Sequence, residues 1–282
     1  MTAVLLWCCF PLAQEPKSRF PTYDEPDPRI GTPNDPLFDC AEPDDEDGGL
    51  VEPCRLLEQQ YQLFGFAPAD SRQTAIDHSG HPQVSGVSAD LAWKRTLGAA
   101  SVIIAVTDTG IVWSNEEVRS KIWLNRGELP IPHGCQSYDC NGDGAFNVDD
   151  YKDEPRVSDG NGNGMLDGQD LIRAFSDGLD DDGNGYIDDI AGWDFLDDDN
   201  DPEDAISTAS AFEHGTNRAR NAAAQTHNAQ GEAGICPACP IMVTRVWDGF
   251  VMPGDQFAQG VVYSADNGAR VQICAIDGLQ NT

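Results

Sequence analysis

Two residues of types that carry proton-transfer chemistry, Asp108 and His214, each lie where a predicted element ends or begins. Asp108 closes the uncharged, β-branched run SVIIAVTD, and His214 opens a helix-prone segment and is followed by Gly215. A carboxylate that orients an imidazole, which then takes a proton from a nucleophile, performs general-base catalysis. Taken singly, an aspartate after a buried strand is more often a turn residue, and a lone histidine is more often a surface residue. The prediction of catalysis therefore depends on the two residues acting together.

Three loops in which aspartate and asparagine alternate with glycine indicate a second chemistry, the binding of a hard cation. Loops 139–150 and 159–170 carry oxygen donors at positions 1, 3, 5 and 12 of a twelve-residue calcium loop, with Gly144 and Gly164 at the sharp turn of position 6. Position 12 is aspartate instead of the usual glutamate, which predicts weaker binding and resembles dockerin-type loops. The third loop, 180–195, lacks an acid at position 12, and the alternative for all three is a solvated acidic coil. The predicted ligands are Asp139, Asn141, Asp143, Asp150, Asp159, Asn161, Asn163, Asp167, Asp170, Asp180, Asp182, Asn184 and Asp188.

The net charge of the chain is concentrated in the same stretch. Between Asp139 and Asp204 there are 22 acidic and three basic residues, which leaves 19 of the 31 net negative charges there. Such a charge argues against DNA, RNA or an anionic membrane as partners, because all three would repel it. Like charges at this density would also push the segment apart, so we expect Ca²⁺ to order it and to stabilise the protein by binding the folded state.

The elements that must position Asp108 and His214 alternate between strands and helices, which predicts an α/β fold with a parallel sheet. In open parallel sheets, functional residues gather at the carboxyl ends of the strands, where Asp108 stands. The last predicted strand is also the last predicted element, so the sheet lacks the later strands that a complete domain would carry, and we expect the domain to be truncated. The predicted elements are a helix at 88–98, a strand at 101–108, a helix at 213–228, a strand at 241–248, a helix at 255–269 and a strand at 270–276.

The rest of the chain suggests a secreted protein. Residues 1–14 are a possible signal peptide, with an incomplete or mis-started leader as the alternative, and 15–87 form a Pro- and acid-rich lead-in with no visible chemistry. Nine cysteines favour an oxidising compartment, extracellular or periplasmic. Cys236 and Cys239 are expected to close a small disulfide loop, with redox or zinc chemistry as the less favoured reading. Cys135 with Cys140, and Cys40 with Cys54, are candidate local disulfides.

The strings VIIAVTDTGI, HGT, GICPACPIMVTRVWDG and FAQGVVYSADNGARV, in this order, resemble the subtilase family of serine proteases from about residue 34 to 282. The resemblance implies a subtilisin-like three-layer fold at 88–282, with an acidic calcium-binding insert at about 127–205. It also implies hydrolysis of protein or peptide substrates, in which Asp108 orients His214 and His214 takes the proton of a serine hydroxyl. The substrate would lie along a strand at Ala275, Ile276 and Gly278.

The sequence also departs from this family pattern. The GTS motif that carries the family's serine does not occur in it, so we expect the chain as given to be inactive. HGTNRARN puts Asn217, Arg218 and Arg220 where smaller or apolar residues would pack against the sheet, and CAIDG replaces the usual Ser-x-Gly of the substrate strand. The alternatives are a catalytically silent, calcium-dependent binding module or pseudoenzyme and, less favoured, a calcium buffer or matrix protein.

Overall fold

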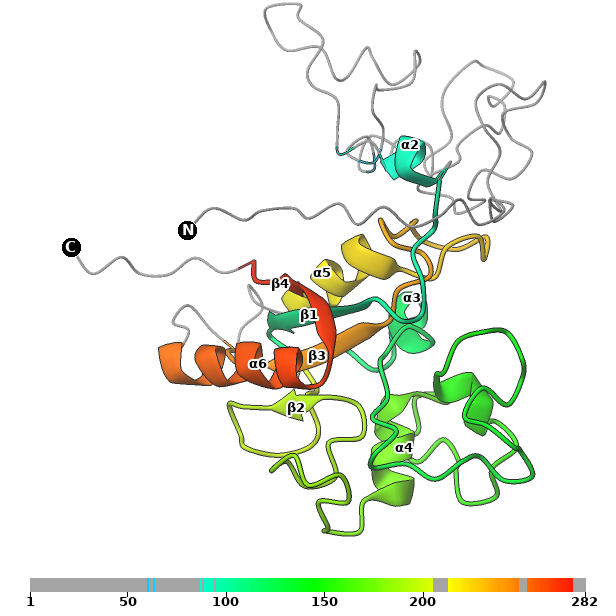
Figure 1. Cartoon of the computed structure of the whole chain (residues 1–282), viewed down its shortest axis with the longest axis vertical. Coiled ribbons are helices and arrows are strands. Elements are labelled where there is room, and N and C mark those ends of the chain that lie inside the picture. Colours follow the sequence, from blue (N-terminus) through cyan, green and yellow to red (C-terminus); the bar gives the residue numbers. More distant parts are fainter. Residues whose placement is uncertain are drawn as a thin grey trace, which may run out of the picture.

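The computed structural model describes residues 60, 63, 87, 89–93, 95–204, 213–248 and 253–275. Its centre is a four-stranded parallel sheet of β1 (Ile103–Asp108), β2 (Trp193–Asp194), β3 (Ile241–Arg245) and β4 (Ala269–Ile273), in the order β2-β3-β1-β4 (Figure 1). Every residue of β3 is buried, as are all but the first of β1. Both faces of these strands must therefore be covered, as their uncharged, β-branched sequences predict.

Helices cover the two faces of the sheet, because alternate residues of a strand point to opposite sides. Ile104 and Val106 of β1 pack in one apolar cluster with the alanines of α5 (His214–Ala223). Ala105 packs in a second cluster with Tyr263 and Phe257 of α6 (Gly254–Asp266). The α/β class and the three-layer arrangement of a subtilisin-like fold are thus confirmed.

The acidic insert forms a loop-rich lobe at one side of the sheet (Figure 1). Its helical elements are η4 (Val148–Tyr151), a 3₁₀-helix, and α4 (Gly168–Phe175). Tyr151, Leu171 and Ile172 are buried in the same cluster as Ile104 of β1, so the insert adds to the core of the sheet instead of forming a separate one. A short helix, α3 (Glu116–Arg119), lies between β1 and the insert in sequence.

Two residues of the lead-in pack against the loop before β3. Gln60 Nε2 donates to the carbonyl of Ala233, and the Ala233 N–H donates to Gln60 Oε1, each at 3.0 Å. Leu63 joins Ala233 and Trp93 of α2 (Ala89–Trp93) in a small apolar cluster. At these two positions the lead-in is structured, whereas the predicted signal peptide and the Cys40 and Cys54 pair lie outside the described residues.

The polar residues of α5 do not take the sheet-facing positions that the sequence predicted for them. The buried residues of this helix are Gly215, Thr216, Ala219, Ala222 and Ala223. The side chains of Asn217, Arg218 and Arg220 lie half-buried on the flanks, and Arg220 Nε pairs with Glu232 Oε1 at 2.8 Å. A sheet-facing stripe of alanines explains how a helix with three such polar residues still packs.

Disulfides join Cys135 to Cys140 and Cys236 to Cys239, which confirms both local pairings. Within the described residues, no helix is long and apolar enough to span a bilayer.

Candidate active site and calcium loops

Asp108 and His214 form a hydrogen-bonded pair at the carboxyl end of β1. Asp108 Oδ1 lies 2.6 Å from His214 Nδ1 and also accepts the N–H of Thr109 at 2.8 Å. Asp108 is fully buried, whereas the His214 side chain is 30% exposed. Burial raises the pKa of Asp108, and the hydrogen bond from His214 opposes that rise. A buried carboxylate thus orients an imidazole that is itself partly exposed.

Gly215 permits this close approach of helix and strand. A Cβ at this position would lie 2.3 Å from the carbonyl oxygen of Gly110 and 3.3 Å from the Cβ of Asp108. Any side chain would push the start of α5 away from the end of β1 and lengthen the distance between the two catalytic candidates. In the sequence HGT, the histidine is therefore required for chemistry and the glycine for the close packing of α5 against β1.

Two further residues, which sequence reasoning did not assign to the site, lie next to the pair. Trp247, just beyond β3, meets the His214 ring edge to face, with ring centroids 5.4 Å apart. Arg245, the last residue of β3, stands beside Asp108 in the sheet register. Among the described residues, nothing forms a hydrogen bond with Nε2 of His214. This nitrogen is the one that would accept a proton from a nucleophile.

The first two acidic loops share one hydrogen-bond pattern. Asp139 accepts the N–H groups of Gly142 and Gly144, at 2.7 and 3.0 Å, and Asp159 accepts those of Gly162 and Gly164 at the same distances. The acids of position 12 also correspond: Asp150 accepts from Cys140, Asn141 and Asn147, and Asp170 from Gly160, Asn161 and Asp167. The two loops thus adopt the same turn.

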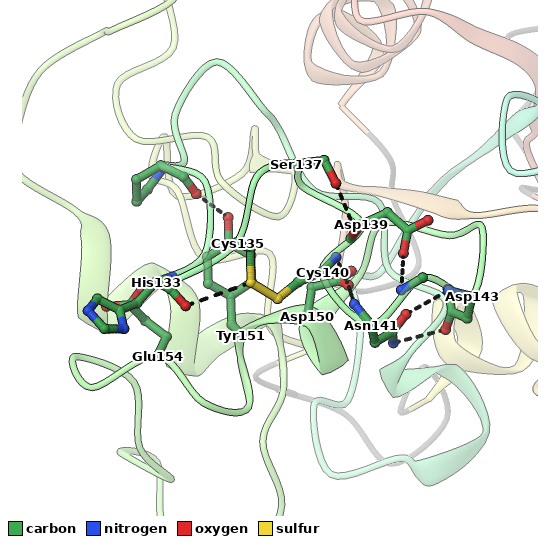
Figure 2. Close-up of a disulfide and its surroundings, with 12 residues drawn as sticks. His133, Cys135, Ser137, Asp139, Cys140, Asn141, Asp143, Asp150, Tyr151 and Glu154 are labelled. Atoms are coloured by element: carbon green, nitrogen blue, oxygen red, sulfur yellow. Dashed lines mark hydrogen bonds between the residues drawn. A yellow bond between two sulfur atoms is a disulfide. The ribbon is translucent and has the colours of Figure 1, made fainter.

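The Cys135–Cys140 disulfide lies at the entrance of the first loop, as Figure 2 shows. Beside it, the Asn141 side chain accepts from the Asp143 N–H at 2.9 Å and donates to Asp143 Oδ2 at 3.0 Å. These polar side chains thus lie together on one side of the loop.

The third loop gathers carboxylates from outside its predicted ligand set. Carboxylate oxygens of Asp180, Asp182 and Glu128 lie within 4.8 Å of one another. Asp188, in contrast, turns away from them and accepts the N–H groups of Asp177 and Gly178, both at 2.9 Å. The sequence missed Glu128 because it lies 52 residues before Asp180 in the chain.

Asp189, also missed, is buried next to the third loop. It accepts hydrogen bonds from Tyr263 (2.6 Å), Asn125 (2.7 Å) and Asn184 (3.1 Å). Burial nevertheless raises its pKa to about 7, and the nearby charge of Asp182 adds to the rise. A divalent cation would offset such a concentration of charge, and carboxylate and amide oxygens are the donors that Ca²⁺ prefers. The residues present therefore fit this ion.

The predicted substrate residues can be followed only in part. Ala275 is half-buried two residues beyond β4, and Ile276 and Gly278 lie outside the described residues.

Comparison with known proteins gives the family. The stretch from 99 to 277 matches the sequence profile of the subtilase family. Over 90 residues the chain is 37% identical to thermitase of Thermoactinomyces vulgaris, covering 32% of this chain and 30% of thermitase. Over 84 residues it is 42% identical to a thermophilic serine proteinase of Bacillus sp. (strain AK1), covering 29% of this chain and 19% of that protein. The chain thus spans less than a third of either relative. Because the family profile covers more than half of its residues, the chain belongs to the subtilase family.

Proposed function

We propose that this protein works as a serine-type endopeptidase of the subtilisin type, with Asp108 and His214 as two members of its catalytic triad. The observation that carries the proposal is the 2.6 Å contact between Asp108 Oδ1 and His214 Nδ1 at the carboxyl end of a parallel strand. Membership of the subtilase family and similarity to a serine proteinase support it.

In the proposed mechanism, His214 Nε2 takes the proton of a serine hydroxyl as that hydroxyl attacks a peptide carbonyl, and later returns it to the leaving amine. Asp108 holds the imidazole in the tautomer that leaves Nε2 free, and its charge stabilises the imidazolium that forms. The serine would reach His214 from outside the described residues. The peptide would lie along the segment that follows β4, at Ala275, Ile276 and Gly278.

We further propose that the three acidic loops bind Ca²⁺ and that the protein acts outside the cytosol. The repeated turn of the first two loops and the grouping of Glu128, Asp180 and Asp182 support calcium binding. The two disulfides support an oxidising compartment, extracellular or periplasmic. The bound ions would stabilise the insert, and through the shared core they would also stabilise the sheet.

The decisive experiment is casein hydrolysis by the full reading frame that contains these 282 residues, with and without a calcium chelator. We expect hydrolysis to fall on the order of 10⁴-fold in Asp108→Asn, which no longer holds His214 in the correct tautomer, and on the order of 10⁶-fold in His214→Ala, which removes the base itself. Glu116→Gln, which alters an exposed acid at the start of α3, is the control and should retain activity.

Hydrolysis that survives both substitutions would disprove the proposal. No hydrolysis in any variant, with calcium still bound, would instead favour the silent calcium-dependent binding module.

A further inference from the structure

We propose that Asp204 is a positioning residue that holds Asp108 and His214 at their working distance; this inference rests on the endopeptidase function proposed above. Asp204 is 6% exposed and lies at the end of the acidic insert. A single oxygen of its carboxylate, Oδ2, accepts the hydroxyl of Thr109 and the main-chain N–H of Glu213, both at 2.9 Å. Thr109 follows Asp108 in the chain, and Glu213 precedes His214. One oxygen atom therefore binds the neighbour of each member of the pair.

Further hydrogen bonds close a ring around this carboxylate. The Gly215 N–H donates to the hydroxyl of Thr109 at 3.0 Å, which ties the first turn of α5 to the end of β1 a second time. The main-chain N–H of Asp204 donates to the carbonyl of Ile111 at 2.8 Å. The N–H of Ile111 in turn donates to the carbonyl of Pro202 at 2.9 Å. Asp204 is thus fixed through its backbone to the segment after β1 and cannot follow α5 if the helix moves away.

Asp204 also supplies what the start of α5 lacks. Glu213, the N-cap residue, has a positive φ of 60° and makes no capping hydrogen bond with its own side chain. A left-handed conformation is unfavourable for a residue with a side chain, and the first N–H groups of a helix need acceptors. Asp204, nine residues earlier, provides one, and its negative charge is favourable at a helix start. It therefore stabilises the strained residue next to the proposed general base.

Four variants separate positioning from general stability. Asp204→Ala removes the shared acceptor, whereas Asp204→Asn keeps an oxygen that can accept both hydrogen bonds. Thr109→Val removes the hydroxyl and keeps the shape of the side chain, whereas Thr109→Ser keeps the hydroxyl. Asp198→Asn makes the same chemical change at an exposed aspartate six residues away and serves as the control.

The first measurement is the downfield proton NMR signal of the His214 Nδ1–H, which reports on its hydrogen bond to Asp108 whether or not the protein hydrolyses peptides. We expect the signal to broaden or disappear in Asp204→Ala and Thr109→Val, and to persist in Asp204→Asn, Thr109→Ser and the control. The second is hydrolysis by the full reading frame, where kcat should fall about 10- to 100-fold in the first two variants with KM within about twofold.

A folded Asp204→Ala variant with an unchanged signal would overturn the proposal, as would an Asn variant that loses the signal as fully as the Ala variant. If Asp204→Ala does not fold, the comparison of Thr109→Val with Thr109→Ser decides instead. Absence of hydrolysis in the wild type would count against the endopeptidase function alone, because the NMR comparison still tests the position of His214.

Discussion

Arg245 is a buried cation at the carboxyl end of β3, 4% exposed and surrounded by acids of the insert. It pairs with Asp194, its neighbour in β2, and with Asp197 at 2.5 Å. Although burial lowers the pKa of Arg245, its hydrogen bonds to Asp197 and Asp194 raise it above the usual value. Asp194 is itself 1% exposed, so each of the two buried charges depends on the other.

Replacing Arg245 by methionine leaves Asp194 buried without its counter-charge, and we expect the free energy of unfolding to fall by about 3–5 kcal/mol. Arg119→Met is the matched control, because Arg119 pairs with the partly exposed Asp149 at 2.7 Å and should cost no more than about 1 kcal/mol. Urea denaturation of both variants gives the comparison, and equal losses would contradict the role of burial.

Sequence reasoning could find the residues whose place along an element is itself informative. Asp108 ends a strand and His214 begins a helix, so both could be named and paired. Asp204 and Arg245 could not be assigned to the site, since their pairing depends on strand register and loop folding. Asp204 binds Thr109, 95 residues distant in the chain, and Arg245 binds Asp194 and Asp197, 51 and 48 residues distant. An aspartate in an acidic stretch has no local pattern that distinguishes it from its neighbours.

At the scale of elements, the glycine at position 6 is what allows each of the first two loops to turn. Gly144 and Gly164 have φ values of 89° and 91°, and a Cβ would meet nothing within 4 Å at either position. A substitution there would therefore act on backbone conformation alone. Gly160 is the contrasting case, with no positive φ and only ordinary contacts near a Cβ.

We expect Gly164→Ala to weaken calcium binding by the second loop about tenfold, because a left-handed conformation costs about 1–2 kcal/mol with a side chain. Gly160→Ala should bind with nearly the wild-type affinity. Calorimetric titration of calcium into the apoprotein measures both affinities. Equal affinities for the two variants would show that the turn at Gly164 does not limit binding.

The spacing of the first two loops was sufficient to predict their turns, because each turn is made by hydrogen bonds within about twelve residues. The third loop depends more on contacts from elsewhere in the chain. Glu128 joins Asp180 and Asp182 from a distant segment, while Asp188 faces away from them. Asp189 is bound by Tyr263 of α6, a contact that only the packed sheet creates.

At the scale of the whole molecule, the segment 121–123, which leads into the insert, is joined to the sheet at the amino end of β3. The carbonyl of Lys121 accepts the N–H of Ile241 at 2.7 Å, and the Trp123 N–H donates to the carbonyl of Ile241 at 2.6 Å, which extends the sheet beside β3. Lys121 Nζ donates to the carbonyl of Pro237 at 2.5 Å. The alternating strand and helix pattern predicted the class of fold, but it held no information about this junction, which depends on backbone contacts between distant segments.

Because of this junction, we expect the free energy of unfolding to vary with pH in the alkaline range. Burial lowers the pKa of Lys121 from 10.5 to about 8 in the folded protein, although Asp143 opposes this shift. Below pH 8 the side chain is charged in both the folded and unfolded states, so the cost of burying the charge is fully present. Between about pH 8 and 10.5 the unfolded state binds more protons, and the contribution of Lys121 to the free energy of unfolding rises with pH.

Lys121→Met removes the titrating group and keeps most of the side-chain volume. We therefore expect the wild type to gain stability relative to this variant, by on the order of 1–3 kcal/mol, as the pH rises through that window. Urea denaturation of both proteins across the window, at constant calcium, measures the difference and cancels the titration of tyrosines and other groups common to both. Parallel pH profiles would show that the ammonium group of Lys121 is solvated in the folded protein and that the junction does not bury its charge.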